Sequence, residues 1–217
     1  MKNLYIYCEG QTEESFINKV LYPYLFNIGI CVIPIICTTK RTKTEKFKGG
    51  ITNYQKIRNE LLILCKQHKN EMLTTMFDYY GLPENTPGIE DISGNLYTRV
   101  SRIEKAIEAD INMPNLFFNL IVHEFEGLLF TETSAFQSIT DNATVAKLQE
   151  VKDGFDSPEY INNSVDTAPS KRIESLIPNY AKILNGIIIS ERIGIDAILS
   201  QCEHFRDWIT KIKSFAT

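Results

Sequence analysis

Short apolar runs alternate with amphipathic segments along the first 130 residues of the chain. The apolar runs have the length of strands and lie at 3–8, 31–38, 72–78 and 116–122. Between them, hydrophobic residues recur at helical spacing over 13–29, 53–68 and 97–111. Strands that alternate with helices in this way form a parallel sheet with helices on both of its faces. The sequence therefore predicts an α/β fold.

This pattern changes after residue 130, where strands become scarce. Short helices and loops follow, up to a last predicted helix over 191–213. A chain of 217 residues is long enough for one substantial core with a small appendage. We predict an α/β core over residues 1–130 and a mostly helical C-terminal extension over 131–217 that packs on this core.

The first predicted helix carries several local signals. Thr12 is placed to cap its N-terminus, and Glu13 and Glu14 in the first turn suit the positive end of the helix dipole. Pro23 has no amide hydrogen, and its ring clashes with the preceding turn. We therefore expect Pro23 to kink or split this helix.

Composition and charge exclude several classes of protein. The net charge of −4 excludes a uniformly basic nucleic-acid binder, but it allows one basic patch or a metal-bridged phosphate site. No apolar run reaches the about 18 residues of a membrane-spanning helix. The start "MKNLYIYCEG" lacks the apolar region of a signal peptide, and five scattered cysteines fit reduced thiols better than disulfides or zinc ligands. We expect a cytoplasmic protein without a membrane partner.

Three of the predicted strands end in acidic residues: the first in Glu9, the third in Asp78, and the fourth in Glu124 and Glu126. In an open parallel sheet, ligands bind beyond the carboxyl ends of the strands, where residues distant in sequence meet. Clustered carboxylates repel one another unless a cation neutralises them, and oxygen ligands favour Mg²⁺ or Mn²⁺. Such an ion activates a water molecule and stabilises a charged phosphoryl transition state. The sequence therefore predicts a Mg²⁺ (or Mn²⁺) site at this edge.

Each of these acids also has a simpler interpretation, because polar residues often follow strands and are then merely solvated. The two glutamates of "VHEFE" depend on the local conformation as well. If this segment is extended, Glu124 and Glu126 share one face, and His123 and Phe125 point the other way. If it is helical, the glutamates diverge and only one of them reaches the site. We favour Glu126 as the ligand.

Five motifs in sequence resemble a known family. "YCEGQTEESF" followed by an aspartate after a later strand is similar to the Toprim domain of topoisomerases, DnaG-type primases and overcoming-lysogenization-defect nucleases. More closely, "EGQTEESF", "FDYYGLP", "HEFEGLLF", "APSKRI" and "CEHFRDWI" resemble a bacterial Toprim-like family of unknown function, DUF4276, from residue 4 to about 209. The resemblance implies a Toprim-like α/β fold and metal-dependent cleavage or transfer of phosphodiesters. It also implies an association with ATPases encoded nearby in mobile-element defence settings.

The resemblance assigns roles to individual residues. Glu9 matches the Toprim glutamate that serves as general acid or base or as a metal ligand, and Asp78 matches the first aspartate of the Asp-x-Asp pair. Tyr80 occupies the position of the second aspartate, so one ligand is missing and a second ion becomes doubtful. Glu124 or Glu126 is then expected to supply the lost carboxylate.

Other residues are candidates for contacts with phosphate. "APSKRIES" predicts a helix start capped by Ser170, which places Lys171 and Arg172 at the positive helix end where anions bind. Solvated charges are the alternative interpretation, and the family resemblance favours phosphate contact. Lys182 is a weaker companion. The basic segment "TKRTKTEKFKGG" at 39–50 is either a grip for a nucleic-acid backbone or a solvated loop.

Two further residue types allow a functional and a structural interpretation. Tyr79 and Tyr80 are placed either to stack on a base or to pack against their neighbours. His123 is a candidate base or ligand, and we favour a hydrogen-bonded structural role for it.

These observations predict a metal-dependent nuclease or phosphotransferase acting on nucleic acid (DNA or RNA). Glu9, Asp78 and Glu126 are the predicted catalytic residues. The predicted metal ligands are Glu9, Asp78, Glu124 and Glu126, and the predicted phosphate-binding residues are Lys171 and Arg172. The alternative is a non-catalytic regulatory or binding module for a partner ATPase. Oligomer formation is left open.

Overall fold

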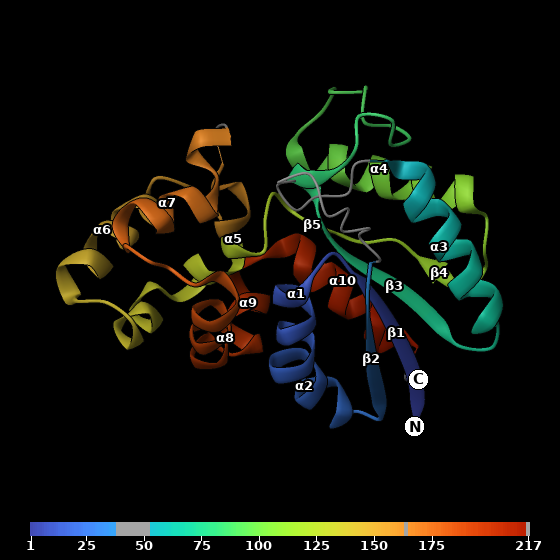
Figure 1. Cartoon of the computed structure of the whole chain (residues 1–217), viewed down its shortest axis with the longest axis horizontal. Helices are drawn as coiled ribbons and strands as arrows, with labels where there is room; N and C mark the ends of the chain where they lie inside the picture. Colours follow the sequence, from blue (N-terminus) through green and yellow to red (C-terminus); the bar gives the residue numbers. More distant parts are fainter. Residues whose placement is uncertain (38–52, 163–164, 216–217) are drawn as a thin grey trace, which may run out of the picture.

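The computed structural model describes residues 1–37, 53–162 and 165–215. Its centre is a parallel sheet whose strands follow the order β2-β1-β3-β4, with β5 pairing with β3 (Figure 1). The strands are β1 (Lys2–Cys8), β2 (Ile30–Ile36), β3 (Met72–Asp78), β4 (Leu116–Phe117) and β5 (Leu120–Ile121). The register places Cys8 of β1 opposite Met76 of β3. The predicted α/β class and parallel pairing are confirmed.

Helices cover both faces of the sheet, and each face has its own hydrophobic core (Figure 1). One core includes apolar residues of α3 (Tyr54–Gln67) and α4 (Leu96–Ile111). These helices begin after the side-chain caps Asn53 and Asn95, and their predicted stripes face the sheet. The other core joins the first helical segments to the C-terminal helices α8 (Lys182–Ile193), α9 (Ile195–Gln201) and α10 (Glu203–Ser214). The boundary at residue 130 stays a prediction.

The first helix is divided into three segments. They are α1 (Gln11–Phe16), a π-helical segment (Ile17–Leu21) and α2 (Tyr22–Phe26). Pro23 is the second residue of α2, just after the π-helical segment ends, so the expected interruption near this proline is confirmed. Thr12 was wrong as the cap, because Gly10 precedes the first helical residue and no side chain caps this helix.

The predicted fourth strand over 116–122 is wrong as one continuous strand, because it forms the two short pieces β4 and β5. Side chains take the backbone hydrogen bonds that would continue it. The amide of Phe118 donates to Glu108 and that of Leu120 to Glu104, each at 2.8 Å. The amide of Asn119 donates to the Thr75 hydroxyl at 2.8 Å. Two acids of α4 thus accept hydrogen bonds from backbone amides at the outer edge of the sheet.

After β5 the described chain is helical, as expected. The elements that precede α8 are α5 (Glu126–Leu129), α6 (Asn142–Asp153), α7 (Pro169–Leu176) and short 3₁₀ segments at Phe130–Ser138, Pro158–Tyr160 and Val165–Thr167. The predicted single helix over 191–213 is wrong. It is divided at Gly194, where φ is +73°, and again at Cys202. Trp208 of α10 donates to the Thr74 hydroxyl of β3 at 2.9 Å, which fixes α10 to the sheet.

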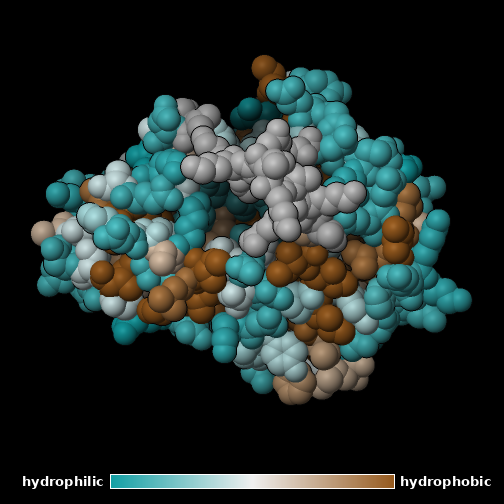
Figure 2. All heavy atoms as spheres, in the orientation of Figure 1, coloured by the Kyte–Doolittle hydropathy of each residue, from teal (hydrophilic) through white to brown (hydrophobic). Residues whose placement is uncertain are grey.

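None of the helices in the described ranges combines the length and the apolar character needed to cross a membrane. All five cysteines are free thiols, as predicted. Hydrophobic residues on the face shown in Figure 2 gather over the edge strand β2 and near α8. The basic segment at 39–50 lies outside the described residues.

Candidate functional site

The acid-terminated strands meet at the carboxyl edge of the sheet. Glu9 follows β1, and its amide donates to the Met76 carbonyl of β3 at 3.3 Å. Asp78 ends β3, and its Oδ1 accepts the Phe125 amide at 3.0 Å. That single hydrogen bond ties the end of β3 to the "HEFE" segment. Gly81 completes this corner, since a Cβ built there would lie 3.6 and 3.7 Å from the two oxygens of the Glu9 carboxylate.

Helix α1 adds a carboxylate that we did not predict. Glu13 is only 7% exposed, and its Oε2 lies close to the backbone at Gly10. A signal for it was present in the sequence, because Glu13 stands three and four residues before Phe16 and Ile17 of the apolar stripe. An acid on the buried face of an amphipathic helix needs a polar partner or an ion. We call Glu9, Glu13, Asp78, Glu124 and Glu126 the carboxylate cluster.

The "HEFE" segment is a turn that leads into the short helix α5. His123 takes a left-handed conformation with φ of +62°, and α5 begins at Glu126. Glu124 Oε2 accepts the Ser170 amide at the start of α7 at 3.0 Å. Glu126 is 4% exposed. Both glutamates lie close enough to Asp78 to raise its pKa, so the turn brings both to the cluster.

Burial and mutual repulsion raise the pKa values within the carboxylate cluster. Burial is the largest cause for Asp78, whose pKa lies well above its ordinary range, and the negative charges of Glu13 and Glu9 add to it. Burial and the charge of Glu13 raise the pKa of Glu9 to about 7, against hydrogen bonding from the Asp78 backbone. The pKa values of Glu13 and Glu126 are also raised, first by burial. The cluster therefore holds more negative charge than its protein neighbours neutralise.

Lys182 is the cation beside these acids. Its Nζ lies 3.4 Å from Glu126 Oε1, and its side chain is 43% exposed. Its charge lowers the pKa values of Glu9, Glu13 and Glu126. Burial acts to lower the pKa of Lys182 itself, but the nearby glutamates raise it above its ordinary value. Sequence reasoning ranked this lysine below Lys171 and Arg172.

The two predicted phosphate-binding residues have other partners. Lys171 Nζ pairs with Glu174 Oε2 at 2.6 Å on the surface of α7. Arg172 donates from Nε to the Thr167 carbonyl at 2.7 Å, and its guanidinium lies 5.4 Å from the centre of the Phe155 ring. Ser170 was wrong as the cap of α7, since Ala168 precedes the first helical residue. The phosphate-binding role of Lys171 and Arg172 stays a prediction.

His123 and the tyrosines surround the turn after β3. The Tyr80 amide donates to the His123 carbonyl at 3.1 Å, and the Tyr80 side chain is 39% exposed. His123 Nδ1 hydrogen-bonds with Asn162 Nδ2 at 3.2 Å. Burial and the charge of Arg99 lower the pKa of His123 to about 4, so this histidine is neutral at neutral pH. These contacts agree with the structural interpretation of His123.

The donor chemistry of the carboxylate cluster suits a hard divalent cation, because it offers oxygen ligands and uncompensated negative charge. Within the described ranges, however, no three His, Cys, Asp or Glu side chains are arranged to enclose an ion. Mg²⁺ typically binds through one or two carboxylates, and waters and substrate phosphate oxygens complete its shell. The described side chains therefore form no closed metal cage, and the binding of Mg²⁺ or Mn²⁺ by these acids stays a prediction.

The fold and the site together define an α/β protein with a cluster of buried and half-buried carboxylates at the carboxyl edge of its parallel sheet. The chain belongs to the family described as domain of unknown function (DUF4276), whose model matches residues 8–213. Its fold is similar to that of the C-terminal region of the OLD protein from Xanthomonas campestris pv. campestris. That match has a TM-score of 0.39 and 18% identity, and it covers 100% of this chain and 98% of that one. No protein of curated function matches the sequence.

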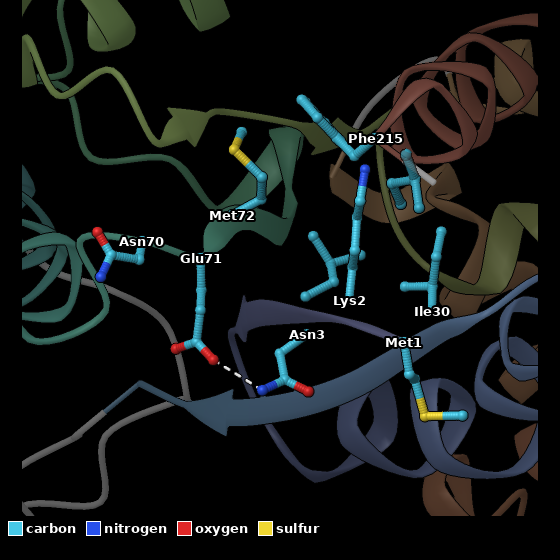
Figure 3. A pocket seen from close by; sticks show the side chains of 10 residues that line it. Met1, Lys2, Asn3, Ile30, Asn70, Glu71, Met72 and Phe215 are labelled. Atoms are coloured by element: carbon cyan, nitrogen blue, oxygen red, sulfur yellow. Dashed lines mark hydrogen bonds between the residues drawn. The ribbon is translucent and has the colours of Figure 1, made fainter. Parts of the chain in front are cut away.

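A pocket lies at the opposite edge of the sheet, where the strands begin (Figure 3). It has a volume of about 490 Å³, and its lining includes Met1, Lys2, Met72 and Phe215. Asn3 Nδ2 donates to Glu71 Oε1 there at 2.7 Å. The acids that we predicted from the strand ends do not line this pocket. Among its described lining residues, Glu71 is a lone acid, so this pocket holds no cluster of carboxylates like that at the carboxyl edge.

Proposed function

We propose that this protein is a Toprim-like, divalent-metal-dependent phosphodiesterase that acts on nucleic acid. The observation that carries the proposal is the convergence of five acids on the carboxyl edge, four of them with raised pKa values. Neighbouring carboxylates with raised pKa values are typical of functional sites. The family resemblance of "YCEGQTEESF" and of the aspartate after β3 points to the same chemistry.

Glu9 and Asp78 would hold a Mg²⁺ or Mn²⁺ ion, with Glu124 and Glu126 as further oxygen donors. When bound, such an ion supplies charge stabilisation for a phosphoryl transition state and lowers the pKa of a water molecule. Glu9 has a pKa near neutrality before metal binding, which suits a group that accepts and returns a proton. Asp78 is oriented by the Phe125 amide.

The basic residues near the cluster would bind phosphate groups of the substrate. Lys182 holds Glu126 in the cluster through their contact at 3.4 Å, and its partly exposed ammonium is accessible to a phosphate. Lys171 and Arg172 would bind phosphates further along a strand, as the family resemblance implies. Their present partners, Glu174 and the Thr167 carbonyl, are at the surface or on the backbone, so a phosphate replaces weak contacts only.

Cleavage assays with matched variants test this function. The purified protein is incubated with single-stranded DNA, double-stranded DNA and RNA in Mg²⁺, Mn²⁺ or EDTA. Glu9→Gln and Asp78→Asn should each lower the cleavage rate by roughly 10²-fold or more, because they remove a proton-transfer group or an oxygen ligand. Glu14→Gln removes the same charge from a neighbouring position and should cleave like the wild type. Equal cleavage by all four proteins would reject the proposal.

A non-catalytic module that regulates a partner ATPase is the second candidate. Tyr80 favours it, because this exposed residue stands where an aspartate would complete the Toprim pair. Calorimetry with Mn²⁺ separates the two candidates. A nuclease should bind the ion and lose that binding in Asp78→Asn, whereas a degenerate module should bind none. If the protein is a regulatory module, the Asp78→Asn variant should still co-purify with an ATPase encoded nearby.

A further inference from the structure

An open pocket of about 500 Å³ lies beside the carboxylate cluster, on the other side of the "HEFE" turn. Its lining comes from the start of α4, from His123 and from the chain after α6. The lining residues are Leu96, Arg99, His123, Gly154, Phe155, Asp156, Tyr160 and Asn162. A pocket of this volume suits a small organic ligand of about the size of a nucleotide. None of the roles proposed above uses it.

Arg99 gives this pocket a positive charge. Its Nε is buried, and it has no hydrogen-bond partner among the described residues. A buried guanidinium donor without an acceptor is costly, and native structures almost always satisfy such a group with protein, water or ligand. Arg99 also lies in the first turn of α4, where the helix dipole disfavours a positive charge and favours an anion. Both features point to an anionic group as the missing partner.

The remaining lining is aromatic and polar. Phe155 and Tyr160 contribute rings, and the Phe155 ring also carries the Arg172 guanidinium at 5.4 Å. The hydrogen bond between Asn162 and His123 closes one side of the pocket at 3.2 Å. Asp156 is the acid in the lining, and it is exposed. Rings, a cation and an acid that accepts hydrogen bonds together suit a ligand with a phosphate, an aromatic ring and amino groups.

The turn at 123–125 connects this pocket to the cluster. His123 lines the pocket, and its carbonyl accepts the Tyr80 amide at 3.1 Å, two residues after Asp78. Two residues further along the turn, the Phe125 amide donates to Asp78 itself. A ligand in the pocket is therefore separated from the carboxylates by a few residues of backbone. The left-handed conformation of His123, which is uncommon among residues other than glycine, lies in the turn between the two sites.

We propose that this pocket holds one nucleotide of a single-stranded nucleic acid, next to the phosphodiester that reaches the carboxylate cluster. Arg99 binds its phosphate, and Phe155 and Tyr160 contact its base. A base inside a pocket has left its stack, which favours single strands over duplexes. This inference rests on the proposed function, because it names the form of substrate that the same site takes.

Binding of a fluorescent single-stranded oligonucleotide to the full chain in EDTA tests the pocket without cleavage. Arg99→Gln should weaken binding by roughly tenfold, as expected for the loss of a hydrogen bond to a charged group. It should also reduce the slope of log K against log salt by about 0.7, the contribution of one phosphate contact on a single strand. Lys105→Gln removes the same charge from an exposed position of α4 and should leave both quantities unchanged.

Arg99→Lys keeps the charge and guards against a folding defect in Arg99→Gln. It should retain the salt slope and lose part of the affinity, because lysine lacks the planar fork of arginine. Wild-type affinity and slope in both Arg99 variants would overturn the inference, as would binding of the duplex that is tighter than binding of the single strand. Competition by a mononucleotide, and much weaker competition by inorganic phosphate, should show that the ring contributes.

The outcomes separate this inference from the proposed function. If Glu9→Gln abolishes cleavage and Arg99→Gln leaves binding unchanged, the nuclease stands and the pocket assignment is wrong. If no cleavage occurs and Arg99→Gln still weakens oligonucleotide binding, the pocket stands and the catalytic proposal is wrong.

Discussion

Replacing Glu9 with glutamine should stabilise the metal-free protein at alkaline pH. In the folded chain, burial and the charge of Glu13 raise the pKa of Glu9 to about 7 from its ordinary value of 4.5. Between these two values the folded protein binds more protons than the unfolded chain, so its stability falls as the pH rises. Glu9→Gln removes this loss, because the amide has a similar shape and does not ionise.

The size of the effect follows from the two pKa values. A pKa of about 7 in place of 4.5 corresponds to about 3 kcal/mol of unfolding free energy at a pH above both. For a chain of this length, 3 kcal/mol shifts the melting temperature by about 6–12 °C. The gain of Glu9→Gln over the wild type should be nearly complete near pH 8, should fall to about a quarter of that near pH 5, and should vanish below about pH 4, where the carboxyl is protonated in both the folded and the unfolded chain.

Thermal unfolding in EDTA, followed by circular dichroism at about pH 5, 6, 7 and 8, measures this difference. Glu14→Gln is the matched control and should follow the wild type at each pH. Added Mg²⁺ should stabilise the wild type, because a bound cation neutralises the negative charge of Glu9 and its neighbours. It should leave Glu9→Gln nearly unaffected, because this variant has already lost the charge of Glu9. A Glu9→Gln protein that is less stable than the wild type at pH 8, or a difference independent of pH, would refute the electrostatic reasoning.

Three further outcomes are expected. Lys182→Met should lower the stability of the metal-free protein by about 1 kcal/mol near pH 8, since its ammonium is partly exposed, and urea unfolding measures this loss. Gly81→Ala should keep the melting temperature but lower the cleavage rate, because the added methyl group lies 3.6 Å from the Glu9 carboxylate and excludes ligands from it. His204→Gln should cost about 3 kcal/mol, since it breaks a buried pair with Glu104 at 2.8 Å. Burial acts to lower the pKa of His204, but the contact with Glu104 outweighs burial and raises this pKa. The pair therefore stabilises the fold fully below about pH 6.5, and this stabilisation is lost as the pH rises through the raised pKa. Comparing the unfolding of the wild type and of His204→Gln at about pH 6 and pH 9 measures the difference.

The alternation of apolar runs and helical stripes was sufficient to predict the class of fold. Ile57 and Leu61, or Val100 and Ile103, recur at a spacing that only a helix brings to one face, and all four are buried against the sheet. Element boundaries were less predictable where side chains compete with backbone pairing. Nothing local in "LFFNLIV" reveals that its amides donate to Glu108 and Glu104, which precede their partners by 10 and 16 residues. Long-range hydrogen bonds of this kind leave no periodic signal.

The candidate site was predictable where it depends on topology. Strand ends that carry acids must share an edge in a parallel sheet, and Glu9 and Asp78 do so. Glu13 was missed because its charge was assigned to the helix dipole, although its spacing placed it on the buried face. The position of Lys182 beside the acids could not be predicted, because its approach to Glu126 depends on how α8 packs on α1 and α5. The catalytic and metal-binding roles of these residues stay predictions.

The two acids that α4 directs at residues 118 and 120 also determine where the molecule can associate with others. An unpaired strand margin is a template on which a foreign strand can add, through its free amides and carbonyls. Here the amides of Phe118 and Leu120 already have carboxylate acceptors, so a strand arriving on that side would have to displace both. Growth of the sheet by addition of a strand is therefore directed to β2, the strand at the other margin.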